Sequence, residues 1–359
     1  MLASLVAQLG TQPAEFDLPA FLQDQQRFQE QLTDSRWSAN PLPYVDGLSS
    51  AVLQHPYAVL CDPADGTIFV TSFTLDHVVR LRMTSRKTAQ YKIFVRGAEL
   101  DAPVGMAIDD ERHLYVASFT NDHILRVHAD SGELLGTFGN DTEMDCPEGI
   151  ALGPDGTLYV VSFLLPYVVR YQPQTGQFLG QFAPPRATAA APRRGVHMTL
   201  PVGWDGGVVP AVPAAPAVPA MRGAEDLAFD AAGDLHVTAY HSSAVFKFNG
   251  STGALESTYA QGVVRGPVGI TCGPDGDMYV ASYRDNQVLR FAPSGRFVGV
   301  AAGATSQRLG GKRGISGPAG ITFADDGTFF VTSHVAGSLT RFNATSLPVR
   351  TWRVTGAGG

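Results

Sequence analysis

The sequence predicts an all-β fold built from six repeated units, and three observations support this prediction. First, the stretch "YVASFTNDHILRV" from Tyr115 to Val127 recurs six times in similar form. Second, successive copies lie 46, 44, 77, 43 and 51 positions apart, and a nearly constant period in this range marks a repeat architecture. Third, each copy follows a hairpin signal. In every copy a small residue precedes a basic one by eight positions; the small residues are Ser72, Ser118, Ser162, Ala239, Ser282 and Ser333.

Each unit is predicted to contain four antiparallel strands. The upstream element "PEGIALGPDGTLYV" from Pro147 has Asp-Gly between two apolar runs, and glycine supplies the positive φ that a tight hairpin turn requires. The basic residue lies in the third strand, and a fourth follows a glycine-containing turn, as in "ELLGTF" from Glu133. Six such units predict a six-bladed β-propeller, in which radial repetition protects the sheet edges and ring closure buries the blade faces.

The two ends of the chain carry different signals. Residues 1–41 are predicted to form an N-terminal helical extension, and residues 42–359 the propeller. The extension is expected to pack on the propeller, with partner binding as the alternative, because its apolar residues have roughly helical spacing: Phe16, Phe21, Leu22, Phe28 and Leu32. The last blade could be completed by "PVRTWRV" from Pro348 or by "LPYVDG" from Leu42, and the sequence leaves both open.

One gap between copies, of 77 residues, is longer than the others. It contains the Pro/Ala-rich segment between Ala183 and Gly223, which cannot join a β-ladder and favours extended polyproline II. We expect this insertion to lie outside the blades, between blades 3 and 4, as a tolerated insertion, a lid or a docking arm. A shorter insertion from Gly303 brings Arg308, Lys312 and Arg313 to the same face.

Composition excludes several classes of protein. With 26 basic and 33 acidic residues the formal net charge is −7, which disfavours nucleic-acid binding because phosphate neutralisation needs a concentrated basic face. The three cysteines, Cys61, Cys146 and Cys272, have no CxxC spacing, so neither a disulfide framework nor a zinc site is expected. No apolar run is long enough for a membrane span, and the opening residues lack the basic region of a signal peptide. The expectation is a soluble cytoplasmic protein without a membrane partner.

The repeated units resemble a known family. Their pattern P-x-G-I-A, D-G, L-Y-V and N-x-x-I is similar to NHL repeats, and more broadly to the propeller superfamily of gluconolactonase-type and streptogramin-lyase-type enzymes. The resemblance covers roughly residues 52–355 and implies the fold. Function must be sought in the site, because the recurring residues serve turns and blade packing.

Positions at which one copy departs from the others indicate a site, since scaffold demands are common to all copies. One position after the residue that opens the first strand of each unit stand Tyr57, Val104, Glu148, Glu225, Val268 and Ala319. Two neighbouring units therefore carry a carboxylate where the other four carry none. First-strand starts and the loops between second and third strands lie on one face of a propeller, so both carboxylates are expected at the channel mouth.

These carboxylates predict a metal site. Glu148 and Glu225, with Asp226 as a third residue, offer the oxygen ligands that Ca²⁺ or Mg²⁺ prefers. "PEGIAL" also resembles the glutamate-glycine opening of the strand that ligates metal in gluconolactonase-type propellers. The alternative is a pair of solvated charges on the rim.

Candidate acid–base residues lie in the loops of the same face. His334 replaces the Phe or Tyr that follows the small residue in the other copies, and His241 and Arg284 take the next position along. They are predicted catalytic residues, with a histidine as acid or base. The polar residues at His77 and from Thr120 to His123 are interpreted instead as turn residues, because turns collect polar side chains for backbone reasons.

Two functions are compatible with this pattern. The leading interpretation is a binding or scaffold propeller that engages a protein or small-molecule ligand through the insertion-bearing face. The alternative is a metal-dependent hydrolase or lyase, whose cation polarises a lactone, ester or C–O bond while a histidine handles the proton.

Overall fold

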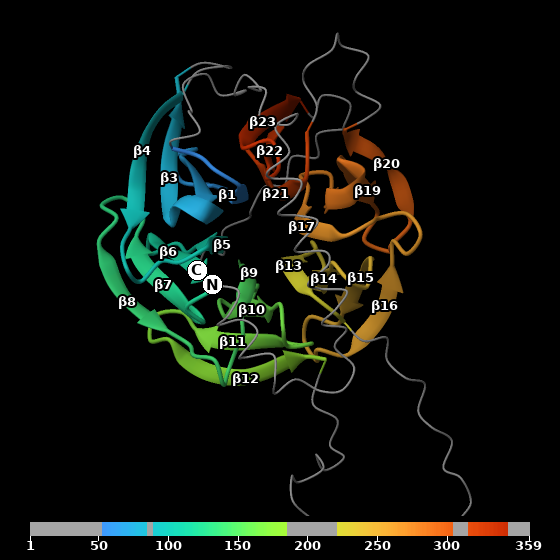
Figure 1. Ribbon diagram of the computed structural model, residues 1–359. Helices are drawn as coiled ribbons and strands as arrows, with labels where there is room; N and C mark the ends of the chain where they lie inside the picture. Colours follow the sequence, from blue (N-terminus) through green and yellow to red (C-terminus); the bar gives the residue numbers. More distant parts are fainter. Residues whose placement is uncertain (1–51, 85–88, 185–220, 304–314, 344–359) are drawn as a thin grey trace, which may run out of the picture. The chain divides into compact units, whose positions relative to one another are not determined.

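The computed structural model of the chain describes residues 52–84, 89–184, 221–303 and 315–343. They form six antiparallel sheets arranged as the blades of a β-propeller (Figure 1). Blades 1 to 3 contain β1 Pro56–Cys61, β2 Ile68–Ser72, β3 His77–Met83, β4 Ala89–Arg96; β5 Pro103–Ile108, β6 His113–Ser118, β7 His123–His128, β8 Leu134–Phe138; β9 Pro147–Leu152, β10 Leu158–Ser162, β11 Val168–Gln172 and β12 Gln177–Ala183. Blades 4 to 6 contain β13 Ala224–Phe229, β14 Leu235–Ala239, β15 Ala244–Phe248, β16 Leu255–Tyr259; β17 Pro267–Cys272, β18 Met278–Ser282, β19 Gln287–Phe291, β20 Phe297–Ala302; β21 Pro318–Phe323, β22 Thr328–Ser333 and β23 Ser338–Asn343.

The predicted six-bladed propeller is confirmed. The six small residues of the repeat occupy equivalent places, each as the last residue of the second strand of its blade. Five blades have four strands, and blade 6 has three within the described residues. Both candidates for its fourth strand, the predicted helical extension and the Pro/Ala-rich insertion between β12 and β13 fall on residues outside this description. In the described part of the chain there is no α-helix, and no helix long and apolar enough to cross a membrane.

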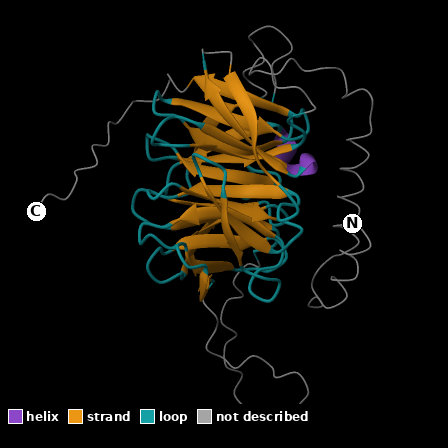
Figure 2. Cartoon of the chain, turned by 90° about the vertical axis from the view of Figure 1, so that its left-hand side faces the viewer, coloured by secondary structure: helices purple, strands orange, loops and turns teal. Residues whose placement is uncertain are grey.

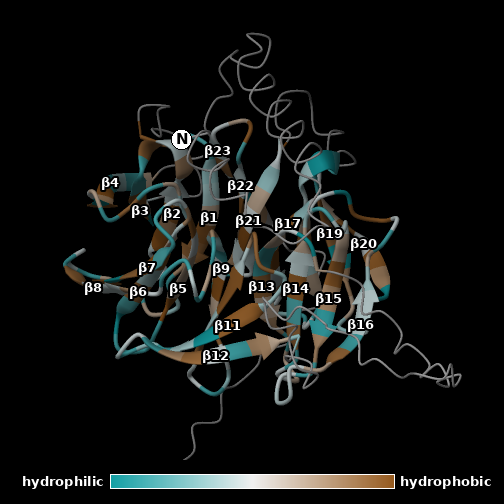
Figure 3. Cartoon of the chain, turned by 60° about the horizontal axis from the view of Figure 1, so that its bottom comes forward, coloured by the Kyte–Doolittle hydropathy of each residue, from teal (hydrophilic) through white to brown (hydrophobic). Residues whose placement is uncertain are grey.

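The first strands of the blades surround the channel. Consecutive first strands contact each other, and β21 contacts β1, which closes the ring. In four of the six first strands, β5, β9, β17 and β21, glycine at the third position lets the strand approach its neighbour closely. A Cβ added at Gly149 would lie 2.6 Å from the Cα of Asp226 in the next blade, so a side chain there requires the strands to move apart. Hydrophobic residues predominate along strands such as β9 (Figure 3).

The core lies between neighbouring blades. The second strand of each blade contributes a buried aromatic ring, as at Phe69 and Phe330. In three blades this ring is a tyrosine, and its hydroxyl donates a hydrogen bond to the Asp of the hairpin turn. Tyr115, for example, donates to Asp109 Oδ2 at 2.9 Å. This pairing removes the cost of burying an unpaired hydroxyl.

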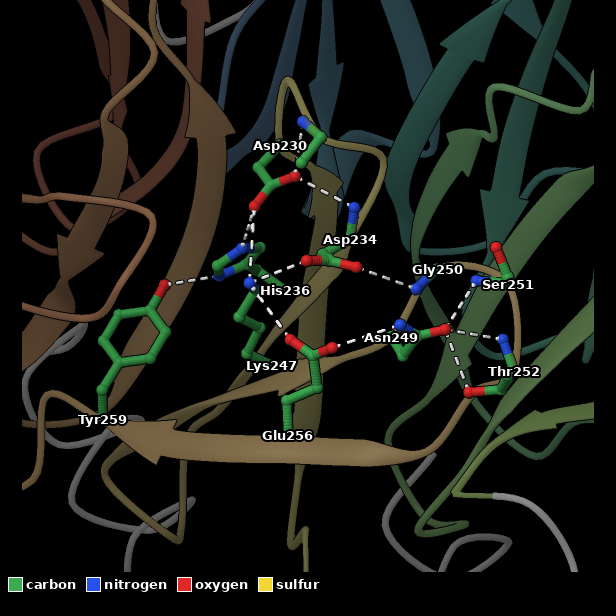
Figure 4. A network of polar contacts seen from close by, with 11 residues as sticks. Asp230, Asp234, His236, Lys247, Asn249, Gly250, Ser251, Thr252, Glu256 and Tyr259 are labelled. Carbon is green, nitrogen blue, oxygen red and sulfur yellow. Dashed lines mark hydrogen bonds and ion pairs between the residues drawn. The ribbon is translucent and has the colours of Figure 1, made fainter.

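Blade 4 replaces that tyrosine with a buried histidine and a larger polar network (Figure 4). His236 Nε2 lies 3.1 Å from Asp230 Oδ2, and its Nδ1 lies 2.9 Å from the Tyr259 hydroxyl. Lys247 Nζ reaches Asp234 at 2.7 Å and Glu256 at 3.1 Å. Burial opposes ionisation of Asp230, but hydrogen bonds from His236 and from backbone amides hold its pKa below the usual value. The network therefore holds the hairpin turn of blade 4.

The loops between second and third strands connect neighbouring blades. In four blades the last loop residue has a left-handed backbone, and its side chain accepts a hydrogen bond from a backbone N–H of the next blade. Asp122 Oδ1, for example, accepts from Cys146 N at 2.8 Å. We call these four residues the blade latches: Asp76, Asp122, Ser243 and Asn286. His77 and His123, which were predicted as turn residues, are instead the first residues of β3 and β7. Each donates to a backbone carbonyl at 2.7 Å.

Candidate functional site

A closed ring of aromatic side chains surrounds one mouth of the channel. It is formed by the residue after each second strand together with His241, and we call it the aromatic collar: Phe73, Phe119, Phe163, Tyr240, His241, Tyr283 and His334. Around the ring the successive centroids lie 5.3 to 6.3 Å apart. The loops gather on two opposite faces of the strands, and the short 3-10 turns η1 (Phe73–Leu75) and η2 (Tyr283–Asp285) lie on this face (Figure 2). We call it the collar face.

Tyr57 lies against this collar and reaches across the channel. Its ring centroid lies 6.1 Å from that of Phe73 and 5.7 Å from that of His334. The Thr332 hydroxyl of blade 6 donates to the Tyr57 carbonyl at 2.6 Å, which fixes the strand that carries the phenol. The phenol donates a short hydrogen bond to Glu225 Oε2 in the opposite blade. Glu148 lies close enough to the phenol for its charge to raise the pKa of Tyr57. We call Tyr57, Glu148 and Glu225 the axial cluster.

The two glutamates of the axial cluster are buried, with 4% and 5% of Glu148 and Glu225 exposed. Burial raises the pKa of Glu148 well above its usual value, and the nearby Glu225 carboxylate raises it further. Burial also raises the pKa of Glu225, to about 8, although the hydrogen bond from Tyr57 lowers it. Desolvation and two close like charges both favour the neutral acid, so the pair retains a proton near neutral pH.

One oxygen of the axial cluster lacks a partner. Among the described residues, Glu148 Oε2 is buried without a hydrogen-bond donor. A buried carboxylate oxygen in this state favours binding of a proton or a cation, because either one compensates the lost solvation.

Asp226 stands next to the cluster in sequence but is engaged elsewhere. Its Oδ1 accepts a hydrogen bond from Leu227 N at 2.9 Å, and its Oδ2 accepts one from Ile270 N in blade 5 at 3.0 Å. Burial raises the pKa of Asp226 to about 7, and these two backbone bonds oppose that shift. The carboxylate thus connects blades 4 and 5, which competes with its predicted role as a metal ligand.

Acidic groups that could hold a metal do occur in the described part of the chain. Two sets of three residues bring their ligand atoms within 4.8 Å of one another: Asp109, Glu111 and His113; and Asp122, Asp145 and Cys146. Glu148, Glu225 and Asp226 do not form such a set. A Ca²⁺ or Mg²⁺ ion still fits the orphaned Oε2 of Glu148 and the two repelling carboxylates, but the cluster offers it two carboxylates rather than three.

The predicted catalytic residues lie in and beside the collar. His334 is 3% exposed and packs against His55, with ring centroids 5.2 Å apart. Burial and the proximity of His55 lower its pKa to about 3, so the imidazole is neutral at physiological pH. His241 packs on Phe163, whereas Arg284 stacks over Tyr240 at 4.8 Å and donates to its hydroxyl at 3.2 Å. Of these three residues, His334 is the one in ring contact with Tyr57.

Sequence reasoning did not select Tyr57. The signal was present, because Tyr57 occupies the same repeat position as the two glutamates and carries the only other polar side chain at that position. A hydroxyl among carboxylates at one level of the channel indicates that the three side chains meet there.

A cavity of about 430 Å³ extends along the channel from the axial cluster. Tyr57 and Glu225 lie at one end of the cavity. The other end is lined by residues near the hairpin turns that join first and second strands: Leu60, Pro63, Ile108, Leu152, Phe229 and Cys272. The volume is within the range of small-molecule pockets.

Comparison with solved structures finds propellers of the same fold. A gluconolactonase from Xanthomonas campestris is 15% identical, with a TM-score of 0.56 over 86% of this chain and 96% of that one. The fold is shared. An inactive variant of virginiamycin B lyase from Staphylococcus aureus, solved with quinupristin, is 13% identical, with a TM-score of 0.51 over 80% and 84% of the two chains. A PQQ-bound aldose sugar dehydrogenase from Streptomyces coelicolor is 15% identical, with a TM-score of 0.51 over 82% and 91%.

At this identity these structures show the fold alone. No family model matches the chain, and no curated protein matches it in sequence. The likeness to NHL repeats therefore stays a prediction.

Proposed function

We propose that the protein is an enzyme, a hydrolase or lyase that acts on a small molecule at the axial cluster. The observation that carries this proposal is the convergence of two buried glutamates and a phenol from three blades on one point of the channel. Burial of two neighbouring carboxyl groups lowers the stability of the fold. Groups whose pKa is shifted in this way concentrate at functional sites. The solved propellers of similar fold include a gluconolactonase, a lyase and a dehydrogenase beside one nutrient-binding protein, and this majority of enzymes supports an enzyme over the binding or scaffold interpretation.

The axial cluster can carry out general acid–base catalysis. Glu225 titrates at about 8, so near neutral pH it can donate a proton to a leaving oxygen, and in its ionised form it can accept one. The hydrogen bond from Tyr57 fixes the orientation of the Glu225 carboxylate. Glu148, with its orphaned oxygen, supplies the second carboxylate.

The neutral His334 is assigned a positioning role in this scheme. An imidazole with a pKa of about 3 is a weak base, but its edge-on packing against Tyr57 holds the phenol in place. His241 and Arg284 lie in and beside the collar next to Tyr240 and do not line the cavity, so they are given no role in this scheme.

A divalent cation would be held by Glu148 and Glu225. When bound, Ca²⁺ or Mg²⁺ would supply Lewis-acid polarisation of a lactone, ester or C–O bond. Asp226 accepts hydrogen bonds from two backbone amides, so two carboxylates remain for the cation. We therefore expect a lower cation affinity than three carboxylates would give.

The test is turnover of a panel of lactones and esters by the wild type and by Glu225→Gln and Glu148→Gln. Loss of a general acid or base lowers the rate roughly 10²- to 10⁴-fold, and this is the expected result for Glu225→Gln. Glu133→Gln is the matched control, because that glutamate is exposed and lies outside the channel. Calorimetry with Ca²⁺ and Mg²⁺ on the same proteins measures the cation separately. Full activity in both channel variants would overturn the proposal.

A further inference from the structure

Four of the six first strands show a gradient of burial along the channel, whereas β1 and β13 alternate between buried and partly exposed residues. In β9 the residues from Pro147 to Ile150 are buried, whereas Ala151 and Leu152 are partly exposed. Strand β17 shows the same change at Thr271 and Cys272. Strands β5 and β21 are buried up to their last residue, which is partly exposed. Solvent therefore reaches the channel from the face of the hairpin turns, which we call the turn face.

The collar face is closed around the cluster. Collar rings contact one another around the channel, and the Tyr57 ring packs against two of them, Phe73 and His334. Glu148, Glu225 and His334 are each at most 5% exposed. Tyr57 itself is only partly buried and lines the cavity, so its open side faces the channel.

The cavity wall is largely aliphatic. Within the described residues, the charged side chains that line the cavity are Glu225 and Asp226, both at the cluster end. The remaining length is lined by glycine, by apolar side chains such as Met106, Ile150 and Ile321, and by the uncharged Thr271 and Thr322. A wall of this kind stabilises an apolar chain by removing it from water, and it offers no partner to a second charge.

We infer that the substrate enters from the turn face and is a slender molecule, with an apolar chain along the cavity and one polar head at the axial cluster. This inference rests on the proposed function in taking the cluster as the reacting centre. The reactive bond then belongs to the head group. Free sugars are expected to bind weakly, because most of their hydroxyls would lie unpaired against the apolar side chains of the wall.

Cys272 provides a reporter for this route, because it lines the cavity near the turn face. The experiment uses a Cys61→Ala/Cys146→Ala protein, in which Cys272 is the single thiol. Burial and the neighbouring Asp230 and Asp275 raise the pKa of Cys272 to about 11, so labelling with a methanethiosulfonate is slow and is followed at about pH 8. The probe is 1-hexanol, a straight apolar chain with one polar head.

The matched control carries its single thiol on the collar face. Thr120→Cys in a protein without other cysteines places it in the exposed loop that follows Phe119. At a hexanol concentration of about ten times its Kd, labelling of Cys272 is expected to slow roughly tenfold, since only the free channel reacts. The control rate is expected to stay unchanged. Circular dichroism confirms that both proteins are folded.

Two results overturn the inference: slowing of the Thr120→Cys protein instead of the Cys272 protein, or no slowing of either. The proposed function is judged by a different readout, the turnover of the glutamate variants. If those variants keep full activity while hexanol protects Cys272, the acid–base proposal fails and the channel route stands. If turnover falls as expected while Cys272 is unprotected, the route alone is wrong.

Discussion

Tyr57 of blade 1 donates a hydrogen bond to Glu225 of blade 4, which lies 168 residues later in the chain and on the opposite side of the channel. This bond spans the propeller axis, so it depends on closure of the whole ring. It also brings the phenol to Glu148 of blade 3. The pair therefore reports on both the fold and the proposed chemistry.

Tyr57→Phe is expected to lower the free energy of unfolding by roughly 1–3 kcal/mol, because a buried carboxylate loses its donor. The pKa of Glu225 should rise at the same time, since the Tyr57 hydrogen bond lowers it. Urea denaturation measures the first effect and a carboxyl titration by NMR the second. Tyr91→Phe is the control, because Tyr91 is 41% exposed on the outer strand of blade 1. Equal stability of the two variants would show that the axial hydrogen bond contributes nothing.

The glutamate pair predicts a loss of stability on the alkaline side. The pKa of Glu225 is about 8 in the folded protein against a usual value of 4.5, so between these values the folded state binds more protons than the unfolded state. The contribution of Glu225 to the free energy of unfolding is therefore fully present below pH 4.5, and it is lost as pH rises through about 8. Glu225→Gln should flatten this part of the stability curve, whereas Glu133→Gln should leave it unchanged. Parallel curves for all three proteins would contradict the elevated pKa.

Asp226→Asn separates a structural role from a metal-binding one. The substitution replaces one carboxylate oxygen with an NH₂ group, so one of the two backbone amides, Leu227 N or Ile270 N, loses its acceptor. The expected cost is roughly 1–3 kcal/mol of stability, measured by urea denaturation. Calorimetry should show the same Ca²⁺ affinity as in the wild type, while Glu148→Gln weakens it. A loss of affinity without a loss of stability would restore Asp226 as a metal ligand.

His334 predicts an effect on the acidic side. Its pKa is about 3 when folded against a usual 6.5, so below the higher value the unfolded state takes up a proton that the native state does not. The stability that the neutral His334 allows is present above pH 6.5, and it is lost as pH falls towards about 3. His334→Phe, which introduces the residue found at this position in blades 1 to 3, should reduce the loss between about pH 6 and 4. An NMR titration of His334 with a midpoint near 6 would refute this.

The fold was predictable because the scaffold is repeated six times. The sequence signal for each turn and strand recurs in the other units, so one ambiguous copy could be interpreted from the rest. The second-strand ends and the hairpin turns followed from spacing alone. The placement of Glu148 and Glu225 at one level of the channel followed from the same register. The role of Tyr57 was not predicted, since the reach of a side chain across the axis depends on the channel width. The engagement of Asp226 with the next blade was also missed, because hydrogen bonds between blades leave no pattern within one repeat.

The blade latches bear on how such a protein can diversify. In four blades the loop between second and third strands commits one side chain, such as Asp122, to the joint with the next blade. The neighbouring loop residues, including the exposed Thr120, are outside that joint. Mutations can therefore accumulate at these positions while the ring stays closed. The collar face can in this way acquire new recognition surfaces during evolution without a corresponding loss of fold.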